Sequence, residues 1–286
     1  MIGRRAPRLE DGRLLRDAIQ EQPEAFLGAE HLAAWGAEPA LLVKLLDPDQ
    51  RLPIHCHPNR QFAAKNLGLR FGKTEAWIVV SVRTRDPFVH LGFRRQMTRD
   101  QLATWVTEQQ SDKLLGSVNR ISVEPGASFL VPAGIPHAVG PGILAVELQE
   151  PTDLSILMEW KGLLDIDGMA EGHLGLGFAR ALDAVDLTAW DQRRLETLRG
   201  SSGYGSVFGA AAEPFFRAER IHGDVMLAPG FSILIVLDGE GALRSESAPV
   251  LELGKGDTIL LPFAAGWCAV AGPLQLIRCL PPVSGS

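Results

Sequence analysis

The sequence has few cysteines, no long apolar run and no cluster of basic residues, and each shortage excludes a class of protein. Only three of its 286 residues are cysteines, and Cys56, Cys268 and Cys279 show no C-x-x-C spacing. An odd number of cysteines without such spacing does not indicate a disulfide framework, so we expect a protein of the reducing cytoplasm. The longest apolar stretches, such as Phe231–Leu237, are too short to cross a bilayer, so no membrane association is expected.

Acidic residues outnumber basic ones. The chain has 28 Lys and Arg against 34 Asp and Glu, which gives a formal net charge of -6 and a pI near 5.7. A nucleic-acid surface needs a basic face, so no nucleic-acid partner is expected. The first residues carry two arginines without an apolar stretch behind them, which is not the pattern of a secretory signal. We expect a small-molecule partner and a protein that is a monomer or homodimer.

Short apolar runs separated by glycine and proline dominate the chain after Ala40, and runs of this length predict β-strands. We expect helices over residues 11–28, Glu30–Trp35, Thr98–Gln109 and Leu182–Arg199. Residues 201–213, a stretch rich in Gly, Ser and Ala, separate the first set of strands from a second set that runs to the C-terminus.

The two β-rich regions resemble each other. The segment GASFLVPAGIPH, from Gly126 to His137, is in register with GDTILLPFAAGW, from Gly256 to Trp267. A repeated small barrel explains two such copies, because closing the strands into a barrel removes exposed edges and leaves a central cavity. We therefore predict a mainly β protein with two jelly-roll β-barrel lobes and additional short α-helices. The first lobe is expected at 1–190, with N-terminal helices and one inserted helix, and the second at 205–286.

A metal site is indicated by histidines and one glutamate in the first lobe. His55 and His57 are two residues apart on a predicted strand, so both side chains point into the barrel and Cys56 points away. Downstream lie Glu75 and the pattern Gly-x5-Pro-x-Gly-x2-His that ends at His137, which resembles the second signature of the cupin proteins. A lone buried histidine is more often a core residue, but this combination predicts one metal site. Three imidazoles and a carboxylate suit Zn, Fe, Mn, Co or Ni.

Four ordered segments resemble those of the type I phosphomannose isomerases. They are RLPIHCHPNRQFAAKN, FGKTEAW, LVPAGIPHAVG and AVELQEPTD. The likeness is close from about residue 41 to residue 186 and loose in the second lobe. It implies one divalent metal ion per chain, zinc first, with Mn, Co, Fe or Ni as alternatives. It also implies that His55, His57, Glu75 and His137 are the ligands, and that a sugar or sugar phosphate is isomerised between aldose and ketose through an enediolate.

The resemblance also supplies two candidate catalytic residues. Lys73 matches a family lysine two residues before the glutamate ligand, where an ammonium could stabilise an enediolate or relay a proton. Glu147 matches the carboxylate of the family's Leu-Glu-x-Gln segment. The alternatives are a solvated lysine in a turn and a strand carboxylate paired with an arginine.

The chain departs from the family in three places. Leu157 stands where the isomerases carry an arginine, which puts recognition of phosphate in doubt, and Lys161, His173 and Arg180 are the nearby candidates to replace it. The family's N-terminal strand and Trp-Gly segment are absent. The second lobe aligns Trp267 with His137, so it is expected to be metal-free and structural.

Two other functions stay open beside a sugar isomerase of the mannose-6-phosphate isomerase type. One is a non-catalytic sugar-binding or regulatory cupin that kept the metal ligands and lost the chemistry. The other is a cupin oxygenase that uses iron. The presence of both Lys73 and Glu147 favours the isomerase over the binding protein.

Overall fold

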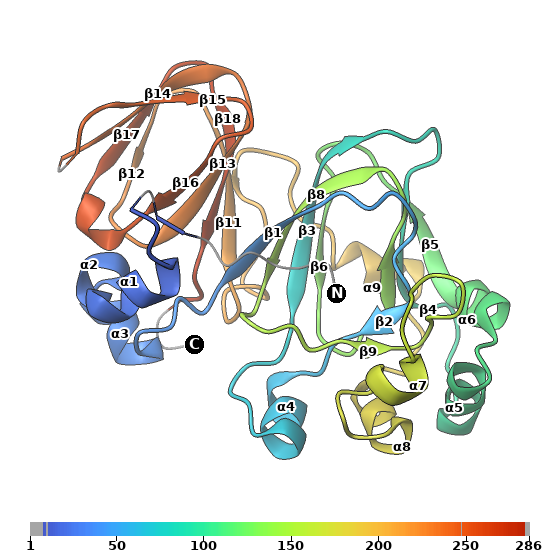
Figure 1. Ribbon diagram of the computed structural model, residues 1–286. Coiled ribbons are helices and arrows are strands. Elements are labelled where there is room, and N and C mark those ends of the chain that lie inside the picture. The colour runs from blue at the N-terminus through green and yellow to red at the C-terminus, as the bar shows by residue number, and fades with distance from the viewer. Residues whose placement is uncertain (1–7, 10, 247, 284–286) are drawn as a thin grey trace. The chain divides into compact units, whose positions relative to one another are not determined.

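The computed structural model describes residues 8–9, 11–246 and 248–283, and the chain divides into two compact units (Figure 1). One unit spans residues 42–202, and the other combines residues 1–41 with residues 203–286. Strands arranged in antiparallel sheets dominate both units, and short helices accompany them. The predicted fold class is confirmed.

The unit of residues 42–202 contains two facing sheets. Their strand orders are β1-β8-β3-β6 and β5-β4-β7-β2-β9. The strands are β1 (Leu42–Leu46), β2 (His55–Cys56), β3 (Glu75–Val82), β4 (Phe88–Phe93), β5 (Val118–Ser122), β6 (Ser128–Val131), β7 (His137–Val139), β8 (Ile143–Gln149) and β9 (Ile156–Leu157). The helices are α4 (Arg60–Leu67), α5 (Arg99–Thr107), α6 (Ser111–Ser117), α7 (Gly168–Glu171), α8 (Phe178–Ala181), the 3-10 turn η1 (Leu182–Ala184) and α9 (Gln192–Glu196).

The interior of this barrel is apolar over most of its length and polar at one end. Val79 and Ala145 face each other across β3 and β8 and pack with Val89 and Val139 from the other sheet. Residues separated by an even number of positions on a strand point to the same side of the sheet. Glu147, two residues after Ala145, and Glu75, four residues before Val79, therefore also face the interior. The polar end of the barrel is therefore formed where β3 begins and β8 ends.

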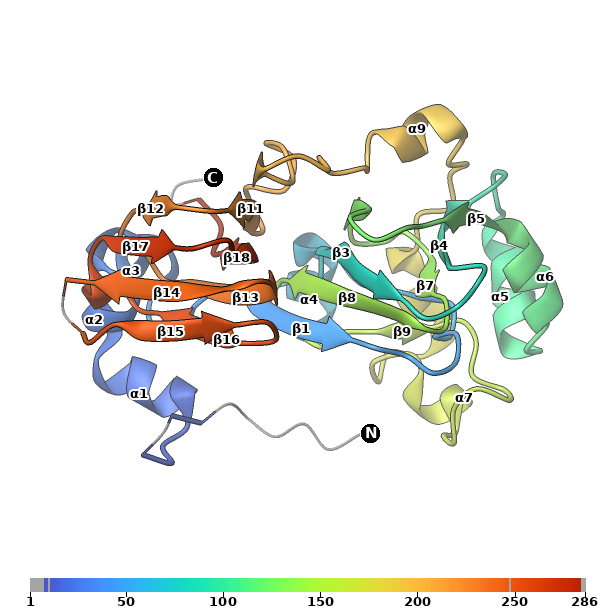
Figure 2. The same ribbon diagram turned by 90° about the horizontal axis from the view of Figure 1, so that it is seen from above.

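The outer face of the second sheet is covered by helices (Figures 1 and 2). Leu102 and Val106 of α5 and Leu114 of α6 pack with Cys56 and Ala138 in one buried cluster. Figure 2 shows α5 and α6 side by side next to β4 and β5. Because the apolar cluster holds Cys56 on this outer side, the neighbouring histidines are left facing inward.

Local sequence signals explain where several helices begin and end. The side chain of Thr98 accepts a hydrogen bond from the backbone N–H of Gln101 and begins α5, as predicted. Asn59 begins α4 in the same way, and Gly68 ends it in the left-handed conformation. The predicted helix over 182–199 is wrong: only η1 and the short α9 form, because an extended segment between them pairs Phe93 with Ala189.

The second unit contains another pair of antiparallel sheets, ordered β10-β11-β18-β13-β16 and β12-β17-β14-β15. Its strands are β10 (Gly205–Ser206), β11 (Arg217–His222), β12 (Val225–Leu227), β13 (Ser232–Asp238), β14 (Glu240–Ser245), β15 (Leu251–Gly254), β16 (Thr258–Leu261), β17 (Cys268–Ala271) and β18 (Gln275–Leu280). Its helices are α1 (Leu15–Glu21), α2 (Pro23–Leu27), α3 (Ala29–Trp35) and the 3-10 turn η2 (Phe263–Ala265).

The N-terminal helices α1, α2 and α3 belong to this second unit and not to the first lobe, where they were expected. Ile19 and Leu27 form one buried cluster with Phe231, which begins the segment into β13. Their apolar side chains therefore cover the second barrel. The later boundary between the units, at Gly203, lies in the stretch rich in Gly, Ser and Ala.

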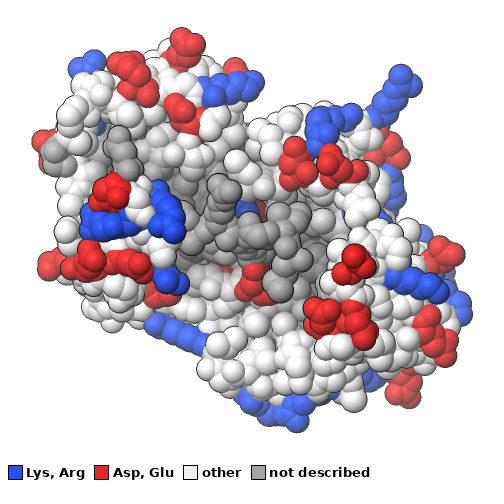
Figure 3. Space-filling model, in the orientation of Figure 1, with Lys and Arg blue, Asp and Glu red and all other residues white. Residues whose placement is uncertain are grey.

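Two features of the described residues bear on possible partners: the length of the helices and the distribution of charge on the surface. No helix among the described residues is long and apolar enough to cross a membrane. On the face drawn in Figure 3, acidic and basic side chains are interspersed rather than gathered in one basic patch. This distribution gives no support to a nucleic-acid partner on that face.

Candidate metal centre and active site

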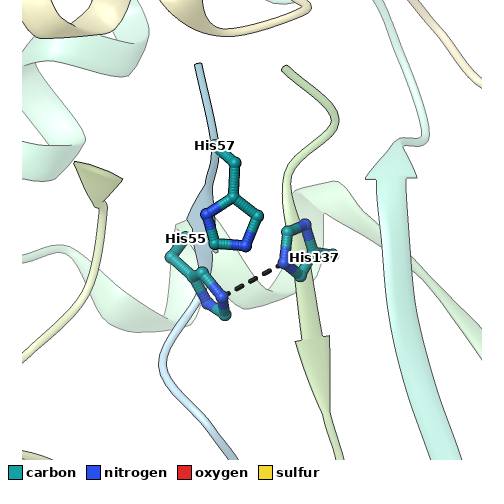
Figure 4. Close-up of side chains that lie close together, drawn as sticks. All are labelled: His55, His57 and His137. Atoms are coloured by element: carbon teal, nitrogen blue, oxygen red, sulfur yellow. Dashed lines mark hydrogen bonds between the residues drawn. The ribbon is translucent and has the colours of Figure 1, made fainter. Parts of the chain in front are cut away.

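Three histidines meet at the polar end of the first barrel (Figure 4). His55 begins β2 and His137 begins β7, and the two residues pair across the antiparallel ladder. His57 follows just after β2. The ring nitrogens that could bind a metal lie within 4.8 Å of one another. The structure therefore brings together the three histidines predicted from the sequence, in an arrangement that could hold a metal ion.

Backbone carbonyls fix the orientation of all three rings. The Nδ1 atoms of His55, His57 and His137 lie 2.8, 2.6 and 2.8 Å from the carbonyl oxygens of Pro53, Leu154 and Ile135. A carbonyl oxygen only accepts, so each Nδ1 must carry the proton. In a neutral imidazole the other nitrogen then has the free lone pair, and these Nε2 atoms turn toward one another. Such outer hydrogen bonds are how proteins orient histidine ligands.

Glu75 completes the cluster. Its Oε2 lies 3.0 Å from His57 Nε2, and its Oε1 lies 3.3 Å from His137 Nε2. The indole N–H of Trp77 donates to Oε1 at 3.0 Å, which fixes the carboxylate from the next inward position of β3. The carboxyl group is 2% exposed. Glu75 therefore lies beside two of the three histidines that could hold a metal ion.

Burial keeps two of the histidines neutral. It lowers the pKa of His57 to about 3, with the Lys73 ammonium acting in the same direction. It also lowers the pKa of His55 well below its ordinary value, together with the two other imidazoles. Burial alone would raise the pKa of Glu75, but Lys73 and the histidines outweigh it and hold that pKa well below its usual range. His55 and His57 therefore offer neutral nitrogens and Glu75 an ionised carboxylate, which are the forms in which these groups bind a metal.

Lys73 is buried inside the same end of the barrel. Its Nζ donates to Glu75 Oε2 at 2.8 Å and lies 2.8 Å from His57 Nε2. The residue is 5% exposed. The alternative of a solvated lysine in a turn is wrong, because this ammonium contacts two of the prospective metal ligands.

Glu147 faces the same interior from β8. It pairs with Trp77 on one side and with Lys44 on the other, in the registers of β3-β8 and β1-β8. Burial raises the pKa of Glu147, and the nearby Glu75 carboxylate adds to that rise. Lys44 Nζ lies 3.5 Å from Glu147 Oε2 and donates to Gln149 Oε1 at 2.6 Å. The cation beside Glu147 is therefore a lysine and not the arginine of the alternative interpretation.

Known proteins with related sequences share one name. The Bacillus subtilis protein named mannose-6-phosphate isomerase ManA is 28% identical over 253 residues, which cover 83% of this chain and 73% of that protein. A protein of Streptococcus mutans named mannose-6-phosphate isomerase is 26% identical over 268 residues, covering 88% of this chain and 78% of its own length. No protein-family model matches the chain.

Solved structures with a similar fold also include mannose 6-phosphate isomerases. The crystal structure of the mannose 6-phosphate isomerase from Bacillus subtilis aligns with a TM-score of 0.73 and 25% identity, over 94% of this chain and 82% of that one. The chain therefore resembles proteins named mannose-6-phosphate isomerase both in sequence and in fold. A putative mannosephosphate isomerase from Archaeoglobus fulgidus has the same fold, with a TM-score of 0.74 and 19% identity over 96% of this chain and 82% of its own.

Leu157 stands at the position where the resemblance to the isomerases predicts an arginine. It lies on β9, pairs directly with His55, and packs against the apolar cluster beneath α5 and α6. The three predicted substitutes for the missing arginine make their polar contacts elsewhere. Lys161 is exposed and its backbone N–H donates to Gln109, His173 Nδ1 accepts from the Gly177 N–H, and Arg180 donates to Asn66. Among the described contacts, none joins these three side chains to the histidine cluster.

Residues that were not predicted from the sequence hold the cluster of His55, His57, His137 and Glu75 in place. Glu150 is fully buried and accepts from Arg60 Nε at 2.6 Å and from the Thr74 N–H at 2.9 Å. It therefore fixes the backbone between Lys73 and Glu75. For Lys44 a signal was available, since a lysine inside the apolar run LLVKLL must find a partner if that run is a strand. Nothing comparable identified Glu150.

Proposed function

We propose that this protein is a metal-dependent aldose–ketose isomerase that interconverts mannose 6-phosphate and fructose 6-phosphate, or a closely related sugar pair. The observation that carries the proposal is the arrangement of the histidines. Backbone carbonyls hold the three rings so that their free Nε2 lone pairs converge beside the Glu75 carboxylate. Relatives named mannose-6-phosphate isomerase support the choice of substrate.

His55, His57, His137 and Glu75 would hold one divalent metal ion per chain, with zinc proposed first. The donor set fits, because two unprotonated Nε2 atoms only 3.1 Å apart, those of His55 and His137, repel each other unless a cation lies beside them. When bound, such an ion polarises the oxygens of the sugar and stabilises negative charge that develops on them.

Isomerisation moves a proton between C1 and C2 of the sugar and leaves negative charge on an enediolate oxygen. Glu147 is suited to take and return the proton, because its buried carboxyl has a raised pKa and faces the interior of the barrel. Lys73 is suited to stabilise the charge. Its ammonium is fixed by Glu75 and needs no reorganisation when the charge forms.

We propose that the enzyme works in the cytoplasm. The three cysteines are free and buried, which fits a reducing compartment. That the sugar is phosphorylated is part of the proposal. The isomerases carry an arginine, which can bind phosphate, at the position of Leu157. An unphosphorylated or differently phosphorylated sugar is the variant to test beside mannose 6-phosphate.

The proposal is tested by following the reaction in D2O with proton NMR. Zinc-loaded protein should convert mannose 6-phosphate to fructose 6-phosphate and introduce deuterium at C1 or C2, since the proton is exchanged on the enzyme. Glu147→Gln should lose this exchange while keeping its metal. A folded protein that converts neither mannose 6-phosphate nor free mannose, with Zn, Mn, Co or Fe, would contradict the proposal. Oxygen uptake with iron instead would favour a cupin oxygenase.

A further inference from the structure

Each of the two barrels has an acidic and a basic residue paired across neighbouring strands, and the two pairs occupy corresponding positions. In the first barrel, Lys44 on β1 pairs across the ladder with Glu147 on β8. In the second, Glu219 on β11 pairs in the same way with Arg278 on β18. The neighbouring inward strand also corresponds, because β3 pairs with β8 as β13 pairs with β18. The charges are reversed: a guanidinium stands where the first barrel has the Glu147 carboxylate.

The metal-ligand positions of the first barrel also have polar counterparts in the second. Glu75 begins β3 and pairs with the last residue of β6, and Ser232 begins β13 and pairs with the last residue of β16. His137 begins β7, and Cys268 begins β17. The side chain at the start of β17 therefore comes from Cys268, which is 2% exposed, and not from Trp267, which is 49% exposed. The alignment by sequence is off by one residue here.

A cavity lies at this end of the second barrel. It has a volume of about 370 Å³ and is lined by Arg217, Glu219 and Arg278 from the strands, by His31 from α3, and by Phe263 from η2. This size suits a small ligand. The expectation that the second barrel is only structural does not account for a cavity lined by two arginines.

Arg278 is buried with its charge incompletely balanced. Its side chain is 7% exposed, Nη2 donates to the Ala228 carbonyl at 2.8 Å, and Nε donates to Ser232 Oγ at 3.2 Å. The only described carboxylate at Nη1 is that of Glu219, at 3.6 Å, which is longer than a good hydrogen bond. Burial lowers the pKa of Arg278; the Glu219 carboxylate opposes this shift, and the positive charge of Arg217 adds to it. A buried cation in this state is stabilised by an additional anion.

We propose that the second barrel binds a small oxyanion, a phosphate or carboxylate group, between Arg278 and Arg217. The planar guanidinium of Arg278 is held through Nε and Nη2 by Ser232 and Ala228, so that Nη1, which lies 3.6 Å from Glu219 Oε2, is the atom that would meet the ligand. Glu219 opposes the anion and turns away from Nη1 when it binds. This site lies at the end of the second barrel that corresponds to the histidine cluster of the first barrel. The histidine cluster suits a cation, whereas the two arginines suit an anion.

The test is isothermal titration calorimetry of the full chain with inorganic phosphate and, separately, with acetate, at constant ionic strength. Arg217→Gln should weaken binding about tenfold, the size expected for losing one charged contact. Glu219→Gln should tighten it several-fold by removing the competing carboxylate. The matched control is Arg244→Gln, which removes an exposed arginine of the same barrel and should bind as the wild type does.

Opposite effects of Arg217→Gln and Glu219→Gln support the site, and the stronger of the two anions gives its chemical class. Arg278→Met should abolish binding, and if that variant does not fold the other two variants still decide. Equal affinity in wild type, Arg217→Gln and Glu219→Gln would overturn the proposal, as would no binding of either anion. The isomerase assay of the same samples reports the first barrel separately, so the two proposals fail independently.

Discussion

Replacement of Lys73 by methionine separates its catalytic role from its place beside the metal ligands. Methionine keeps an unbranched apolar chain and removes the ammonium that lies 2.8 Å from both Glu75 Oε2 and His57 Nε2. If that ammonium stabilises the enediolate, the variant loses one charged hydrogen bond in the transition state. Such a bond contributes about 1.5–3 kcal/mol, which corresponds to about a ten- to hundredfold lower kcat.

The same change acts differently on metal binding and on stability. Lys73 repels a divalent ion at the neighbouring ligands, so the variant should hold its metal at least as well as the wild type. Without metal, Glu75 loses its ammonium partner while 2% exposed, and breaking a buried pair costs about 3–5 kcal/mol of unfolding free energy. A bound metal ion keeps a cation beside Glu75, so the loaded variant should be less destabilised.

The assay combines kcat for sugar interconversion, metal per chain by elemental analysis, and urea unfolding with and without metal. Lys65→Met is the matched control, since Lys65 is an exposed lysine of α4 in the same unit. An unchanged kcat in Lys73→Met would refute the catalytic role. A kcat that falls only in proportion to lost metal would show that Lys73 merely supports the ligands.

Three further changes test other parts of the account. Leu157→Arg should raise kcat/KM for mannose 6-phosphate relative to free mannose by about tenfold or more. If the wild type already converts mannose 6-phosphate and does not convert free mannose, another residue binds the phosphate. Glu159→Ala should cost about 3–5 kcal/mol in urea unfolding, because the buried Glu159 accepts two hydrogen bonds from Arg51 and one from the Ile54 N–H; a loss below 1 kcal/mol would contradict this. Burial lowers the pKa of His90 from 6.5 to about 4, so between these pH values the unfolded chain binds more protons and stability falls as the pH falls. His90→Asn should flatten that decline in thermal melts, and an unchanged slope would exclude His90 as a cause.

The cluster of three histidines could be predicted because strand geometry fixes it locally. Two histidines separated by one residue must share a face of a strand, and the Gly-Pro-Gly turn before His137 places it at the start of the next strand. The positions of Lys44 and Trp77 beside Glu147 and Glu75 depend on the long-range pairing of β1, β3 and β8. Periodicity within one strand does not reveal which strand will be its neighbour.

Two errors show where sequence patterns lose information. An amphipathic helix reveals its apolar face but not which core that face covers, so the packing of Ile19 and Leu27 against Phe231 could not be foreseen. The alignment of Trp267 with His137 failed because the 3-10 turn η2 precedes β17 and shifts its first inward residue to Cys268. Both were decided by the tertiary structure.

The most direct test of the central claim is the initial rate of fructose 6-phosphate formation from mannose 6-phosphate as zinc is added back to chelator-treated protein. Because His55, His57 and His137 could hold one metal ion and Glu75 lies beside two of them, the rate should rise linearly and level off at one zinc per chain. His137→Gln, which removes one ligand, should stay inactive over the same range. Full activity of the chelated protein, or one bound zinc per chain without conversion of the sugar, would contradict the account.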